Sequence, residues 1–180
     1  MRARSSARSA SPGFTLLELA VVIFIMGLML SLVMPYLGGF KQAALRSQAR
    51  RLAGRATFMY DQAAGHKVVL RLTFNLDMNA YAVARLDPYA IRPVFQPDQS
   101  PTGRPVILPP EVQIRDVTVE GIGTVKRGVI STNFYPEGYV NATIVHLQDS
   151  SGNVMTLMFT PLTGKVVIAR GDVMPRGMYR

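Results

Sequence analysis

The chain has 180 residues, contains no cysteine and carries a formal net charge of +9 at pH 7. The absence of cysteine excludes disulfide bonds, thiol catalysis and Cys-ligated metal centres. About 140 residues remain once the N-terminal leader and apolar segment are set aside, which is enough for one domain with its own hydrophobic core.

One long apolar segment lies near the N-terminus. Residues 13–39 read GFTLLELAVVIFIMGLMLSLVMPYLGG, and Glu18 is the only charged residue between Phe14 and Phe40. As a helix, the uncharged run from 19 to 37 would be about 28 Å long, close to the thickness of a bilayer core. A carboxylate there costs about 2.5–3.5 kcal/mol or more, so Glu18 is a candidate functional residue. The alternative is that Glu18, near the end of the run, simply reaches the headgroup layer.

The order GFTLLEL from Gly13 to Leu19, followed by the apolar run, closely resembles the N-terminal signature of type IV prepilins and type II secretion pseudopilins. The resemblance implies that a prepilin peptidase cuts the leader between Gly13 and Phe14 and N-methylates Phe14. It also implies that Glu18 meets the Phe14 amine of a neighbouring subunit during assembly. Pairing the two charges would offset part of the cost of placing each in lipid.

The resemblance and the charge pattern together predict the location of the protein. The leader carries Arg2, Arg4 and Arg8, and basic residues before an apolar run favour a cytoplasmic N-terminus. Further basic residues follow the run, but long translocated domains often override the charge rule. We therefore expect a single-pass inner-membrane protein with a periplasmic C-terminal domain. The predicted parts are a leader (1–13), a transmembrane assembly helix (14–39), the periplasmic half of the same spine helix (40–65) and a β-sheet domain (66–180).

Residues 40–64 show helical periodicity. Pro35 lacks the N–H that would bond the Ser31 carbonyl, so we expect a kink or local melting between Ser31 and Gly39, or a helix end at Pro35. Gly65 is the predicted stop. The predicted buried stripe consists of Leu45, Ala49, Leu52, Ala56, Met59, Tyr60 and Ala63. Five basic residues lie largely off the stripe: Lys41, Arg46, Arg50, Arg51 and Arg55. They could form a solvated face, a surface that binds anionic lipid headgroups, or a contact with another subunit.

From His66 onward the apolar period changes to two, which is typical of strands. The stretch from Pro88 to Pro110 holds seven of the twelve prolines and is predicted to be a long loop. The fold class is therefore α+β, with a long N-terminal spine helix and antiparallel sheets packed on its C-terminal half. Eight strands are predicted, at 67–74, 80–86, 104–108, 112–120, 129–134, 139–148, 153–160 and 165–169.

The second half of the chain carries a further resemblance. The segments FYPEG (134–138), TIVHL (143–147), SGN (151–153) and TPLTGKV (160–166) look like the ending of H-type minor pseudopilins. That resemblance implies the pseudopilin fold, a spine helix packed on two antiparallel sheets. It also implies that the other major and minor pseudopilins are partners.

No catalytic motif is present: the sequence lacks a P-loop, G-x-S-x-G, H-E-x-x-H and a Rossmann fingerprint. His66 and His146 lie 80 residues apart and are interpreted as turn or strand residues. The run from Asp149 to Asn153 has the spacing of the first EF-hand ligands, but Thr160 stands where the bidentate glutamate would be. A hairpin turn is the favoured interpretation, and we predict no enzyme activity, cofactor or metal.

The C-terminal tail contains Arg170, Arg176 and Arg180. Clustered arginines with an aromatic residue could contact nucleic acid, as in some related minor pilins. Asp172 and the shortness of the cluster argue against DNA as a partner, and a solvated chain end is the favoured interpretation.

The predicted function is that of a minor pseudopilin of a type II secretion system, near the tip of a periplasmic pseudopilus that drives export of folded proteins. Since the subunit capping the tip typically lacks the glutamate, Glu18 places this chain below the cap. The alternative is a minor pilin of a type IV pilus, with DNA binding for uptake as a variant. A third class, a signal-anchored periplasmic enzyme, requires processing after the apolar run or none.

Overall fold

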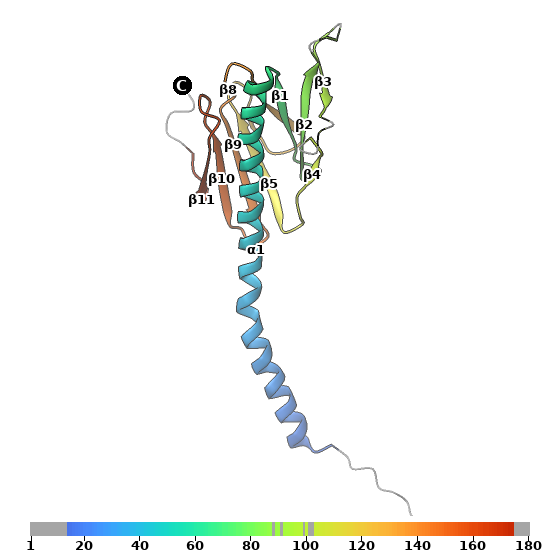
Figure 1. Cartoon of the computed structure of the whole chain (residues 1–180). Coiled ribbons are helices and arrows are strands. Elements are labelled where there is room, and N and C mark those ends of the chain that lie inside the picture. Colours follow the sequence, from blue (N-terminus) through green and yellow to red (C-terminus); the bar gives the residue numbers. More distant parts are fainter. Residues whose placement is uncertain (1–13, 88, 91, 99, 101–102, 175–180) are drawn as a thin grey trace, which may run out of the picture. The chain divides into compact units, whose positions relative to one another are not determined.

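The computed structural model describes residues 14–174 except 88, 91, 99 and 101–102, and gives only the backbone for residues 33–41 (Figure 1). The chain forms two compact units, Met1–Gly38 and Gly39–Arg180. The predicted leader, Gly13, Arg176 and Arg180 lie outside the described residues. The finer boundaries predicted at 13, 39 and 65 stay predictions.

A single helix, α1 (Leu16–His66), runs through both units. It begins one residue after the predicted start, because Thr15 acts as the N-cap: the backbone N–H of Glu18 donates to Thr15 Oγ1 over 3.3 Å. Helical backbone continues through Pro35, so the alternatives of local melting and of a helix end at Pro35 are wrong. The predicted kink at Pro35 stays a prediction.

The helix does not stop at Gly65. It ends at His66, and Lys67 takes the left-handed conformation with φ of 54°. The N–H of Val68 then donates to the carbonyl of Ala63 over 3.2 Å. This six-to-one bond is the Schellman pattern that satisfies a helix C-terminus, here made with a lysine where glycine is more common.

All strand pairs are antiparallel, and they form two sheets in the second unit. The first sheet has the order β3-β2-β1-β7-β8, with β4 also pairing β2, and the second has the order β11-β10-β9-β5-β6. The strands are β1 (Leu70–Asn75), β2 (Ala80–Asp87), β3 (Val94–Pro97), β4 (Val106–Ile107), β5 (Val112–Val119), β6 (Gly123–Val125), β7 (Val129–Tyr135), β8 (Tyr139–Val140), β9 (Thr143–Asp149), β10 (Val154–Phe159) and β11 (Val166–Arg170). The predicted α+β class, a helix followed by antiparallel sheets packed on it, is confirmed.

Three features of the sheets differ from the prediction. The proline-rich stretch contains β3, whose Phe95 ring lies 3.4 Å from the Arg71 guanidinium carbon. The short strand β6 was also missed. The predicted strand 139–148 is two strands, β8 in the first sheet and β9 in the second. The chain passes from one sheet to the other at Asn141, whose side-chain oxygen accepts the N–H of Asn133 over 3.0 Å. Tertiary contacts, rather than local periodicity, set each of these features.

The second half of α1 supplies the spine of the core. The predicted stripe is confirmed: Leu45, Ala49, Leu52, Ala56, Met59 and Ala63 are at most 2% exposed. They form one hydrophobic cluster with residues from both sheets, such as Phe74 of β1 and Phe159 of β10. The exposed and half-buried arginines lie off this stripe, as predicted. One face of one helix therefore organises both sheets.

Tyr60, the half-buried member of the stripe, locks two loops onto the helix. Its hydroxyl lies 2.7 Å from the carbonyl oxygen of Gly138 and 2.9 Å from that of Leu162. Gly164 has φ of +60°, and a Cβ atom built there would overlap the Tyr60 ring. The glycine is thus required twice, by its backbone conformation and by the space that the ring occupies.

We expect Gly164→Ala to lower the free energy of unfolding by about 2–4 kcal/mol, because it adds left-handed strain and overlap with an anchored ring. Gly152→Ala is the matched control, since Gly152 has φ of +87° but no atom within 4 Å of its built Cβ; it should cost only about 1–2 kcal/mol. Urea unfolding followed by circular dichroism measures both. Equal losses for the two variants would contradict the role given to Tyr60.

Candidate assembly site

The predicted assembly residues lie in the first unit, on a helix surface that the described part of the chain leaves uncovered. Every residue from Phe14 to Leu32 is exposed, including Phe14 (79%) and Leu16 (88%). Soluble proteins rarely expose so continuous an apolar surface unless it meets a partner or a membrane. Within the residues that the structure describes, no helix meets the length and hydropathy required to cross a membrane.

Glu18 stands in the first turn of α1. Four unsatisfied N–H groups and the positive end of the helix dipole favour a carboxylate at this position. Thr15 and Glu18 have the spacing of a capping box, and the structure contains its Thr15 half, the bond from the Glu18 N–H. Sequence analysis missed this signal. The two residues therefore define where the helix begins, and Glu18 lies four residues after Phe14.

The remaining predicted site residues do not gather with Glu18. Pro35 lies inside α1. Arg170 is the last residue of β11 and is exposed. It lines a groove together with Arg46 and Arg50 of α1. The predicted nucleic-acid cluster is thus represented among the described residues by Arg170 alone.

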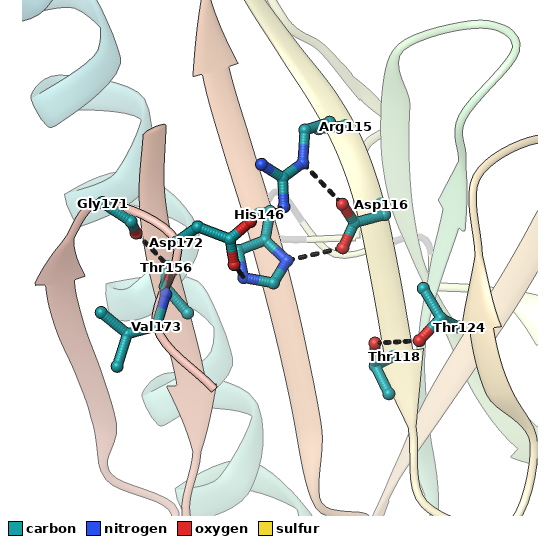
Figure 2. A network of polar contacts seen from close by, with 9 residues as sticks. All are labelled: Arg115, Asp116, Thr118, Thr124, His146, Thr156, Gly171, Asp172 and Val173. Atoms are coloured by element: carbon teal, nitrogen blue, oxygen red, sulfur yellow. Dashed lines mark hydrogen bonds and ion pairs between the residues drawn. The ribbon is translucent and has the colours of Figure 1, made fainter. Parts of the chain in front are cut away.

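A buried polar network in the second sheet was not predicted from sequence (Figure 2). His146 of β9 is 0% exposed, and its Nδ1 lies 2.5 Å from Oδ1 of Asp116 on β5. The pairing register shifts between Ile114 and Asp116, which leaves Arg115 as the extra residue of a β-bulge. A bulge re-aims the neighbouring side chains, and here Asp116 and Arg115 both join the network.

The network links the chain segment after β11 to the sheet. Arg115 Nε lies 2.6 Å from Asp116 and Nη2 lies 2.8 Å from Asp172. Nε2 of His146 is 3.2 Å from Asp172 Oδ1, yet it makes no hydrogen bond within the described part of the chain. The two atoms are close, but their orientation does not form a hydrogen bond. Thr156 adds a bond of 2.6 Å to the carbonyl of Gly171.

The environment of Asp116 shifts its titration. Burial alone would raise the pKa of this carboxyl, but hydrogen bonds from His146 and Arg115, and their positive charge, outweigh burial and lower the pKa below its ordinary value. Asp116 is therefore ionised at neutral pH. An ionised Asp116 is the acceptor that the buried imidazole requires.

Asp149 shows why the calcium-like spacing is a hairpin turn. Its carboxylate accepts the backbone N–H groups of Ser151 and Asn153, each over 2.9 Å, and the Asn153 side-chain amide over 2.8 Å. The predicted turn is confirmed. Over the described residues there is no group of three or more His, Cys, Asp or Glu residues placed to hold a metal ion.

We expect Asp116→Asn to lower the free energy of unfolding at pH 7 by about 2–3 kcal/mol, since the carboxylate's bonds to the Arg115 guanidinium and to the buried His146 ring are lost. Because the folded pKa of Asp116 is depressed, its contribution is present above about pH 4 and is lost as the pH falls through the folded pKa. The variant should therefore lose less stability than the parent on acidification below pH 4. Asp61→Asn, at an exposed position of α1, is the control. Parallel acid-unfolding curves for the parent and Asp116→Asn would contradict the assignment.

Comparison with known proteins adds two findings. Residues 8–34 match the model of the prokaryotic N-terminal methylation motif. A comparison with curated protein sequences gives no significant match. The matched motif includes Gly13, Phe14 and Glu18.

Solved structures share the fold. The minor pseudopilin EpsH from the type 2 secretion system of Vibrio cholerae superposes with a TM-score of 0.59 at 11% identity, covering 73% of this chain and 99% of that one. A second EpsH structure gives a TM-score of 0.56 at 11% identity, covering 73% and 98%. The solution structure of E. coli GspH gives 0.52 at 12% identity, covering 71% and 89%. The chain thus carries the prokaryotic N-terminal methylation motif and has the fold of the minor pseudopilins EpsH and GspH.

Proposed function

We propose that the chain is a minor pseudopilin of a type II secretion system, a structural subunit near the tip of a periplasmic pseudopilus that drives the export of folded proteins. One observation carries the proposal: an apolar helical segment, exposed from Phe14 to Leu32 and with a single carboxylate in the first turn, leads into a domain with the minor pseudopilin fold. Such a helix is suited to pass between two apolar surroundings, a bilayer and a filament core. The role is assembly rather than catalysis.

The N-terminal segment would anchor the subunit before assembly. The methylation motif supports processing by a prepilin peptidase between Gly13 and Phe14, with methylation of the new Phe14 amine. The exposed apolar surface from Phe14 to Leu32 supports insertion into the inner membrane. The leader arginines favour a cytoplasmic N-terminus, which leaves the β domain in the periplasm.

Glu18 would set the axial register between subunits. After processing, the Phe14 amine is a cation at one end of an apolar helix, and Glu18 is an anion about one turn along it. Each charge alone is costly in an apolar surrounding, and an attraction between charges of opposite sign offsets part of that cost. The Glu18 carboxylate can pair with the amine of a neighbouring subunit only when the two subunits have one particular offset along the filament axis. Other major and minor pseudopilins are the partners that could supply this amine.

We expect Glu18→Ala to be processed normally but to fail to enter the pseudopilus. Loss of the charge pair, with about 2.5–3.5 kcal/mol at stake, should reduce incorporation by about a hundredfold. The measurement is co-isolation of the variant with sheared or cross-linked pseudopili in cells that carry the remaining secretion genes. Glu111→Ala, which removes an exposed carboxylate from the β domain, is the control and should be incorporated. Normal incorporation of Glu18→Ala would refute the role given to Glu18.

A further inference from the structure

We propose that one end of the β domain, the end at which α1 enters it, is a docking surface for the anionic phospholipid headgroups of a bilayer. The inference rests on the proposed function, because it needs the N-terminal segment to be in that bilayer. It adds a second contact of the unassembled subunit with the membrane, made by the folded domain itself. We call this surface the entry end.

Hydrogen bonds and shared grooves bring turns that are distant in sequence together at the entry end. Residues 42, 45 and 46 of α1 share a groove with the turn between β9 and β10. That turn is tied to the start of β5, since Ser150 N–H donates to the Glu111 carbonyl. Asn79 of the β1–β2 turn bonds Val112 and Ile114 of β5 over 2.7 and 2.9 Å. The β6–β7 turn joins through Gly128 N–H and Asp77 over 3.1 Å.

Three large apolar side chains stand exposed on the part of the entry end formed by the first sheet. They are Met78 (65%), Ile107 (70%) and Val129 (61%). Ile107 pairs with Ala80, two residues after Met78, and Val129 pairs with Asn75, three residues before it. They therefore form one patch across three chain segments. Side chains of this kind insert into the headgroup and acyl boundary of a bilayer.

Basic residues lie on another part of the entry end, where α1 meets the second sheet. Arg46 and Arg50 of α1 and Arg170 of β11 line one groove with Met155 and Ile168. No acidic residue of the described chain forms an ion pair with any of the three arginines. Guanidinium groups bind phosphate oxygens in a bidentate manner.

Two more cations and few available anions complete the entry end. Lys126 and Arg127 are exposed in the β6–β7 turn. Three nearby carboxylates have partners within the protein. Asp77 accepts a hydrogen bond from the Gly128 N–H, and Asp149 accepts one from the Ser151 N–H of its own turn. Asp172 lies beside Arg115 and His146. Glu111 is the exposed exception. Lys126 and Arg127, like the three arginines of the groove, form no ion pair with an acidic residue of the described chain, so these cations are free to attract an anionic membrane surface.

The covalent link makes the contact feasible. Five peptide units separate Leu37, the last residue of the bilayer-length run from 19 to 37, from Gln42 in the arginine-lined part of the entry end. Even fully extended they span no more than about 18 Å, and as helix only about 8 Å. A domain tethered so closely meets the headgroups at a high effective concentration. A bilayer is thus the anionic partner that the chain itself brings to this surface.

The test uses the full processed chain in vesicles, and the absence of cysteine allows single labels. Met78→Cys and Ile122→Cys, each labelled with bimane, form a matched pair: the native residues are 65% and 63% exposed. Ile122 follows the far end of β5, where Val119 pairs with Gly123, away from the entry end. Vesicles contain phosphatidylethanolamine with or without phosphatidylglycerol, and a headgroup-level spin-labelled lipid serves as quencher. Flotation reports whether the chain is anchored at all.

We expect strong quenching at position 78 and little at 122, only in vesicles with phosphatidylglycerol and reduced by high salt. The triple variant Arg46→Ala, Arg50→Ala and Arg170→Ala should lower the docking equilibrium constant by about a hundredfold, whereas Arg104→Ala should not lower it. If the chain floats but both labels are quenched equally, the docking surface is wrong while anchoring stands. If the chain does not float, anchoring fails and docking falls with it. A DNA shift lost in the triple variant, with equal quenching, would assign the arginines to nucleic acid and overturn the proposal.

Discussion

The packing of one face of α1 against both sheets is the constraint on which the rest of the domain depends. Its stripe, from Leu45 to Ala63, joins a single core cluster with residues of each sheet. Polar contacts add to this packing: the Thr143 hydroxyl bonds Thr132 over 2.8 Å, and the Asn79 side chain bonds Val112 and Ile114 of the second sheet. Tyr60 extends the same principle to the loops, since one hydroxyl on the helix lies within reach of two carbonyls 24 residues apart.

The two halves of α1 differ in how their apolar residues are arranged and exposed. From Phe14 to Leu32 every side chain is exposed, although the segment is the most apolar of the chain. From Leu45 onward the apolar residues are confined to one face, and that face is buried. A surface that is hydrophobic all round is suited to lipid or to a bundle of like helices, whereas a one-sided stripe is suited to a globular core. The change in pattern separates the exposed segment, to which we assign the proposed role in assembly, from the part of α1 that organises the fold.

Periodicity and residue order along the sequence predicted those features that depend on residues close to one another in the chain. The buried stripe of α1 and most strands follow from periods of 3.6 and 2, and the segment from Gly13 to Glu18 follows from residue types in fixed register, which the matched methylation motif supports. The pairing of His146 with Asp116 was beyond this reasoning, because it depends on a bulge and on two strands 30 residues apart. The strand β3 was missed for a similar reason: its Phe95 is held by Arg71 of another strand.

The central claim is that the apolar helix is an assembly element released by cleavage in front of Phe14, with Glu18 four residues further on. Mass spectrometry of the N-terminus of the protein isolated from cells that carry the prepilin peptidase tests this most directly. The account predicts a chain that begins at N-methylated Phe14. A chain that still begins at Met1, or one cut after the apolar run, would contradict it.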